Sequence, residues 1–78
     1  SIWSDMNLVV LDNAKLCAER GWKGSFHLHS GEVIESGFIT GTNWEEGVIS
    51  VERVGERHLP PRILFLKDVK HIEVGWEK

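Results

Sequence analysis

Leu11–Val33, with the sequence LDNAKLCAERGWKGSFHLHSGEV, is the stretch that decides the fold, because its periodicity changes halfway. Residues 11–20 contain no glycine or proline and carry apolar side chains at helical spacing. Gly21 is a natural helix end, because glycine adopts the left-handed conformation there without a steric penalty. After Gly21 the apolar residues alternate with a period of two, as in a strand. We therefore predict one helix followed by a β body.

The N-terminal boundary of this helix is marked less clearly than its end. Ser4 or Asp5 is a suitable cap, because a short side-chain oxygen accepts from the free N–H groups of a first turn. Asp12 and Asn13 are poor helix formers, however, so we expect an extended lead and a helix that starts near Leu11. The predicted division of this single domain, residues 1–78, is a leader or extension at 1–10, a helix at 11–21 and a barrel at 22–74.

Five short strands are expected in the β body. Phe26 and Leu28 share one face of the first strand, and a Ser-Gly pair at 30–31 marks the tight turn after it. Gly37 marks a bend in the second strand, as a small barrel requires at its corners. The later strands are expected at 32–41, 48–54, 62–66 and 69–74, with Ile49 and Val51 facing inward. This pattern predicts an α+β, mainly β fold: an N-terminal helix packed on a five-stranded antiparallel barrel of the Sm-like, SH3-like or OB type.

The composition is that of one small globular domain. Its 78 residues are 41% hydrophobic and 27% charged, which allows one core and no deep substrate cavity. A single cysteine, Cys17, excludes an internal disulfide framework and fits a reducing compartment. No apolar run is long enough to cross a bilayer, so we expect a cytoplasmic protein that does not insert into a membrane. The net charge of −3 argues against a nucleic-acid footprint and favours a protein partner.

No set of catalytic residues emerges from the sequence. His27 and His29 are two residues apart on one strand face, a spacing that can hold a metal. A metal site needs three or four ligands, however, and His58 and His71 have no recognisable spacing to this pair. Cys17 lies on the apolar helix stripe, where a cysteine is usually a small hydrophobe rather than a nucleophile. We therefore expect no enzyme activity, no metal and no cofactor.

Two groups of residues are candidate binding surfaces. Trp44 stands in a polar loop, where it either anchors an interface or folds back over the core. A modest basic cluster surrounds the third and fourth strands and consists of Arg53, Arg57, Arg62 and Lys67. In an Sm-like barrel this cluster could contact RNA, but the net charge favours the alternative that it balances an acidic face.

Short motifs between residues 10 and 74 carry a resemblance to a known family. They are Leu11-Asp12-Asn13, Leu16, Leu28 and Gly31-Glu32, followed more loosely by the segment RILFLKDVKHI at 62–72. In these residues and in the order of its elements, the chain resembles the Rof family of Rho-binding antiterminators. Members of that family are similar to Sm-like barrels preceded by a helix. They bind the transcription terminator Rho and block its access to RNA through an acidic surface, without catalysis.

The resemblance implies a function for the acidic residues of the helical region. Asp12, together with Asp5, would contact a basic RNA-binding surface of the partner and mimic phosphate charge. The segments at 21–24 and 60–61, GWKG and PP, depart from the family's pattern, so a shared fold is compatible with a different target. We expect a protein that inhibits Rho or a related RNA-handling protein. The alternatives are direct RNA binding by an Sm-like barrel and self-association through Trp44 or an edge strand.

Overall fold

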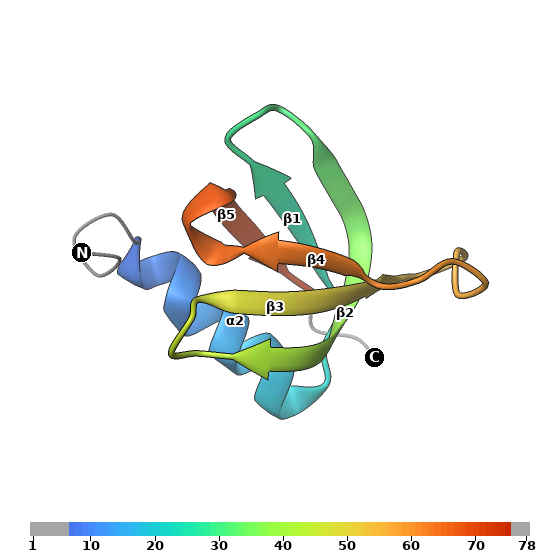
Figure 1. Cartoon of the computed structure of the whole chain (residues 1–78), viewed down its shortest axis with the longest axis horizontal. Coiled ribbons are helices and arrows are strands. Elements are labelled where there is room, and N and C mark those ends of the chain that lie inside the picture. The colour runs from blue at the N-terminus through green and yellow to red at the C-terminus, as the bar shows by residue number, and fades with distance from the viewer. Residues whose placement is uncertain (1–6, 76–78) are drawn as a thin grey trace.

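The computed structural model describes residues 7–75, which form one helix and a five-stranded antiparallel sheet (Figure 1). The elements are helix α2 (Leu8–Arg20), strands β1 (Gly24–Leu28), β2 (Val33–Asn43), β3 (Val48–Arg53) and β4 (Arg62–Phe65), the 3-10 turn η1 (Leu66–Asp68) and strand β5 (Val69–Val74). The strand order is β4-β3-β2-β1-β5, so β4 and β5 are the two edges of the sheet. The predicted fold class, a helix on a mainly β, barrel-like body, is confirmed.

Helix α2 begins at Leu8, one turn before the predicted start near Leu11. The cause is Asn7, whose Oδ1 accepts hydrogen bonds from two backbone N–H groups of the first turn at 2.8 and 3.4 Å. The expected break at Asp12 and Asn13 does not occur, because tertiary packing overrides their weak propensity. Residues 8–10 therefore belong to the helix rather than to a leader. The caps considered at residues 4 and 5 lie outside the described residues.

The C-terminal end of α2 is where the sequence places it. Gly21 adopts the left-handed conformation, with φ 66°, and its backbone N–H donates to Cys17 O. Two residues, Trp22 and Lys23, then lead the chain into β1. Among residues 7–75, no helix is both long and apolar enough to cross a membrane.

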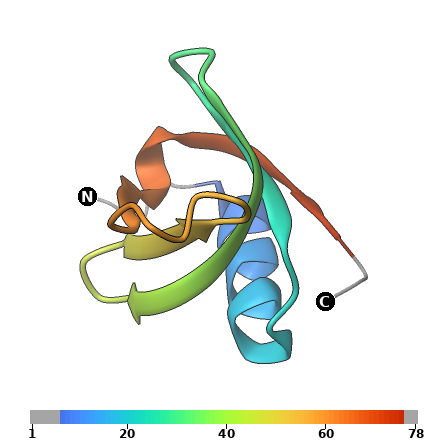
Figure 2. The same ribbon diagram turned by 90° about the vertical axis from the view of Figure 1, so that its right-hand side faces the viewer.

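Strand β2 bends because it pairs with two neighbours in succession. Its first half pairs with β1 and its second half with β3, and Gly37 belongs to both ladders, opposite Gly24 and Arg53. A Cβ at Gly37 would overlap Val51 Cγ1, so the bend depends on glycine for this close approach. Figures 1 and 2 show β2 curving around the body from β1 to β3. The bend predicted at Gly37 is thus confirmed.

The core lies between one side of α2 and the inward face of the sheet. Phe26 is its largest fully buried side chain, with 0% exposure. The inward residues predicted on the first and third strands, Phe26 with Leu28 and Ile49 with Val51, are all buried. The helix contributes Val10, Leu11, Ala14 and Cys17. Alternate residues of β1 and β5 therefore face outward, where a functional site can form.

The turn η1 connects the two edges of the sheet. The predicted fourth strand includes Leu66, but β4 ends at Phe65 because Leu66 turns inward and is 1% exposed. The backbone N–H of Leu66 donates to Gly47 O (2.8 Å), just before β3. The backbone N–H of His29, just after β1, donates to Asp68 O (2.9 Å). These two bonds tie η1 to both halves of the sheet.

Candidate functional site

The outward side of α2 carries Asp12, the residue singled out by the family resemblance. Asp12 is exposed and forms no ion pair or hydrogen bond through its side chain with any residue between 7 and 75. Leu8 and Val9, in the first turn, are 61% and 66% exposed. Leu8 and Asp12 are four residues apart and therefore neighbours on the helix surface. This surface, which we call the helix patch (Leu8, Val9 and Asp12), combines apolar area with a free carboxylate. Asp5, the second predicted contact, lies outside the described residues.

Trp44 lies in the turn between β2 and β3. Its side chain is partly buried and packs against the core, as in the second of its two sequence interpretations. Lys15 Nζ lies over the indole ring, 5.8 Å from its centroid. This contact is a cation–π interaction and ties the turn to α2. The structure therefore joins Trp44 to the helix, and only part of the ring is available to a partner.

The arginines of the predicted basic cluster are each matched by a glutamate. Arg62 and Glu32 form a bidentate pair at 2.6 and 3.1 Å. The other two pairs join Arg57 Nε to Glu52 Oε1 at 3.0 Å and Arg53 Nε to Glu56 Oε1 at 3.7 Å. Exposed pairs of this kind contribute little to stability, but they reduce the positive potential that phosphates would meet.

Two of these pairs line a cleft of about 370 Å³ between the start of β2, the end of β3 and the start of β4. We call it the arginine cleft; its lining residues are Glu32, Val33, Ile34, Glu35, Ser36, Arg53, Val54, Glu56 and Arg62. The hydrogen bonds from Arg62 lower the pKa of Glu32, and the same bonds raise the pKa of Arg62. Arg53 Nε is buried without a hydrogen-bond partner in the described residues, since Glu56 is beyond hydrogen-bond distance. Because both arginines of the cleft are paired, it offers no free cation to an anion, and Glu35, which has no ion pair in the described residues, adds further negative charge.

Lys67 is the member of the basic cluster without a carboxylate partner in the described residues. It is exposed in η1, and its Nζ lies 5.9 Å from the centroid of the Phe65 ring. The four cluster residues are thus not one free basic surface. Three are neutralised by glutamates, and the fourth is a single exposed ammonium.

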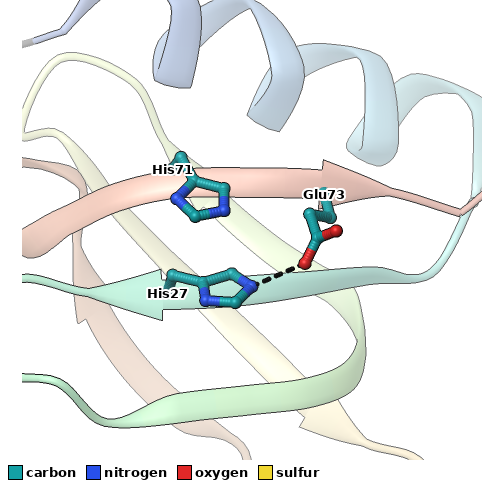
Figure 3. Close-up of side chains that lie close together, drawn as sticks. All are labelled: His27, His71 and Glu73. Carbon is teal, nitrogen blue, oxygen red and sulfur yellow. Dashed lines mark hydrogen bonds and ion pairs between the residues drawn. The ribbon is translucent and has the colours of Figure 1, made fainter.

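The structure brings together a group of side chains that sequence reasoning did not assemble (Figure 3). His27 on β1 is directly opposite His71 on β5, and the two imidazole rings stack with centroids 4.1 Å apart. His27 Nε2 is 2.8 Å from Glu73 Oε1. We call His27, His71 and Glu73 the histidine cluster. His29, the predicted partner of His27, lies beyond the end of β1 and outside this group.

The sequence does not reveal the histidine cluster because its members are far apart along the chain, with His27 and Glu73 separated by 46 positions. The partner of His27 is set by the antiparallel register of β1 and β5, not by its neighbours along the chain. The one sequence signal is local: His71 and Glu73 are two residues apart on a strand and therefore share a face. That signal gains meaning only once β5 is known to lie beside β1.

Cys17 is buried in the core, as its position on the apolar stripe predicts. Burial raises the pKa of the Cys17 thiol, because a thiolate would lose its hydration there. A raised pKa opposes formation of the nucleophilic thiolate. The packing of Cys17 therefore serves the core.

Comparisons of the chain with protein-family models, with curated proteins and with solved structures gave no match.

Proposed function

We propose that this chain is a non-catalytic binding module that inhibits an RNA-handling protein by docking the helix patch on a basic surface of that partner. The resemblance to the Rof family makes the transcription terminator Rho the first partner to test. The observation that carries the proposal is which charged side chains are paired with an opposite charge and which are not. The arginines that could hold phosphates are paired with glutamates, whereas Asp12 is exposed and unpaired among residues 7–75.

The helix patch has both components of a protein interface. Leu8 and Val9 offer exposed apolar area, and burying one such side chain contributes roughly 1.5–3 kcal/mol. Asp12 adds a charge that favours a basic surface and disfavours an acidic one, which gives specificity and a faster association rate. In this arrangement the carboxylate takes the place of a phosphate of the RNA that the partner would otherwise bind.

Direct RNA binding is the alternative that the described charges support least. An RNA-binding surface gains most of its non-specific affinity by neutralising phosphates with free cations. Here Arg53, Arg57 and Arg62 already neutralise glutamates, and RNA would have to displace those carboxylates.

Self-association is a second candidate, favoured by the edge strand β4. Ile63 and Phe65 on this strand are 61% and 49% exposed, and β4 pairs on one side with β3. An edge strand with exposed apolar side chains is a template for pairing with another chain. A cytoplasmic location belongs to the principal proposal and is supported by the single, unpaired cysteine.

The proposal is tested by measuring the affinity of purified Rho for the wild-type chain and for two charge-reversal variants. Asp12→Lys should weaken the complex by at least about tenfold, since a basic surface would then face a lysine. Glu19→Lys is the matched control, because Glu19 is also exposed on α2 but lies nearly two turns away. It should bind within about threefold of the wild type, a difference below 1 kcal/mol.

Circular dichroism must show that both variants keep the wild-type melting temperature. Equal affinities of Asp12→Lys and the wild type would refute the role of the helix patch. An RNA gel shift that appears at low salt and weakens steeply as salt rises would instead support direct RNA binding. A dimer mass in light scattering, without Rho, would support self-association through β4.

A further inference from the structure

The outward face of β1 and β5 presents three metal-ligand side chains at adjacent positions. His27 and His71 are directly opposite each other in the antiparallel ladder, and Ser25 is opposite Glu73. The inward positions between them belong to Phe26 and Ile72, which are buried in the core. The three ligand side chains therefore project from the same side of the sheet, as Figure 3 shows.

The sheet itself holds these side chains together. Their backbones are joined by the ladder hydrogen bonds between β1 and the edge strand β5, and β1 is held on its other side by β2. The His27 side chain is only 26% exposed, so part of its conformational freedom is already lost in the folded chain. A ligand that used these groups would need to order little more than the side chains of His71 and Glu73.

The donor set distinguishes between classes of cation. Two imidazole nitrogens and one carboxylate oxygen are typical ligands of Zn²⁺ and similar transition-metal ions. Mg²⁺ and Ca²⁺ prefer coordination by oxygen atoms, and this cluster supplies oxygen ligands from only one carboxylate. The chemistry of the cluster therefore points to a zinc-type ion and away from the alkaline-earth ions.

The distances are close to those that such an ion requires. One donor atom from each residue lies within 4.8 Å of the others. Two ligands of a tetrahedral zinc ion, each bonded at about 2.0–2.1 Å, are roughly 3.3 Å apart. The His27 Nε2 to Glu73 Oε1 distance of 2.8 Å would open slightly as the ion replaced the shared proton. His71 would move closer to complete the set.

The stacked imidazole rings would have to tilt. Their planes are 12° apart with centroids at 4.1 Å, so their nitrogen lone pairs lie in two nearly parallel planes that do not meet at one point between the rings. Rotation about the terminal ring torsion is broad and costs little, which allows both lone pairs to converge on one ion. His71 is exposed, so no core packing opposes this rotation.

Further negative charge lies beside the cluster. Glu73 also lines a pocket of about 200 Å³ together with Glu35 and Ser25. A second carboxylate near the ion would raise its affinity without having to be a direct ligand. Lys23 lines the same pocket and partly offsets this effect.

We propose that His27, His71 and Glu73 form a surface site for one divalent transition-metal ion of the zinc class. Three protein ligands leave a fourth position of a tetrahedral ion open. Water or a side chain of a bound protein would fill it. The site lies on β1 and β5, and it stands or falls independently of the docking role proposed for α2.

The test is calorimetric titration of the untagged full chain with ZnCl₂, near neutral pH. The wild type should bind one ion per chain. His71→Ala and Glu73→Gln should each weaken binding by at least about tenfold, since even the loss of a partner that merely orients a ligand typically costs 10–100-fold. His29→Ala and His58→Ala are the matched controls, because these exposed histidines lie outside the cluster. Both should bind zinc like the wild type.

Two further measurements separate a built site from loss of folding or from scattered binding. Substitution with Co²⁺ should give the strong visible absorption of a tetrahedral ion with nitrogen ligands, and His71→Ala should abolish it while circular dichroism is unchanged. Zinc affinity should also fall as the pH is lowered, because protons compete for the imidazole nitrogens. Equal affinity in the wild type and His71→Ala, or no saturable binding to the wild type, would overturn the proposal.

Discussion

The arginine cleft and the histidine cluster are two polar regions on the same sheet, and they use charge in opposite ways. In the cleft, Arg62 and Glu32 satisfy each other through two hydrogen bonds, and Arg53 lies beside Glu56. In the histidine cluster, His27 bonds to the Glu73 carboxylate and His71 stacks on the His27 ring. Both arginines of the cleft are therefore matched by its own glutamates, whereas the cluster keeps nitrogen and oxygen atoms that can bind an ion.

The difference shows that charged residues grouped in the sequence do not have to form a charged surface, because each can be paired with an opposite charge in the folded protein. The basic residues between 53 and 67 look like one surface until the partners of the three arginines are known, which lie just before β2, on β3 and in the turn after β3. The histidines look scattered until β5 is placed beside β1. In both regions the pairing across strands changes the chemistry that the sequence alone suggests.

Truncation of a large core side chain beneath the sheet should have the largest effect on both regions. Phe26→Ala deletes a side chain that is 0% exposed and lies on β1 directly before His27. The expected loss is about 3–5 kcal/mol in the free energy of unfolding, which is most of the stability of so small a domain. Denaturant unfolding followed by circular dichroism measures it. A loss below 1 kcal/mol would contradict the core position of Phe26.

Substitution at the bend should have a smaller effect that still reaches both regions. Gly37 pairs with Gly24 on β1, the strand that carries His27, and with Arg53 in the cleft. Gly37→Ala places a Cβ against Val51 Cγ1, and overpacking of this kind costs about 1–3 kcal/mol. Gly55→Ala is the spatial control, because a Cβ there meets no atom within 4 Å. Its positive φ makes some strain expected, so the comparison rests on which variant shifts the amide resonances of both ladders.

The smallest effect should separate the cleft from the cluster by pH. The folded-state pKa of Glu32 is lowered by Arg62, so the pair stabilises the fold above the unfolded-state pKa. This contribution is lost as the pH falls through the lowered pKa of the folded state. Glu32→Gln should therefore melt slightly below the wild type at neutral pH, and the two curves should converge in acid.

Thermal melts between pH 7 and pH 2 measure this convergence. Glu45→Gln is the matched control, because Glu45 is exposed and forms no side-chain ion pair with another described residue. It should show no such change with pH. A difference between Glu32→Gln and the wild type that persists unchanged into strong acid would show that charge is not the source of the effect.

Several features of the fold could be predicted from the sequence because short-range physics determines them. Gly21 ends the helix because the left-handed conformation is available to glycine at no steric cost. Phe26 and Leu28 face the core because a strand alternates, and Gly37 allows the bend because it has no Cβ. The predicted start of the helix near Leu11 is wrong, because it follows from the weak helix propensity of Asp12 and Asn13, whereas Asn7, a good cap by the same short-range rules, begins the helix at Leu8.

The sequence by itself determined one helix, five antiparallel strands and the side of the first and third strands that enters the core. Only the tertiary structure decided that His71 lies opposite His27, that glutamates form ion pairs with the arginines, and that Trp44 packs beneath Lys15. The physical reason is range. Helix ends and strand alternation depend on residues a few positions apart, whereas the partners of exposed polar side chains depend on register between strands that are far apart in the sequence.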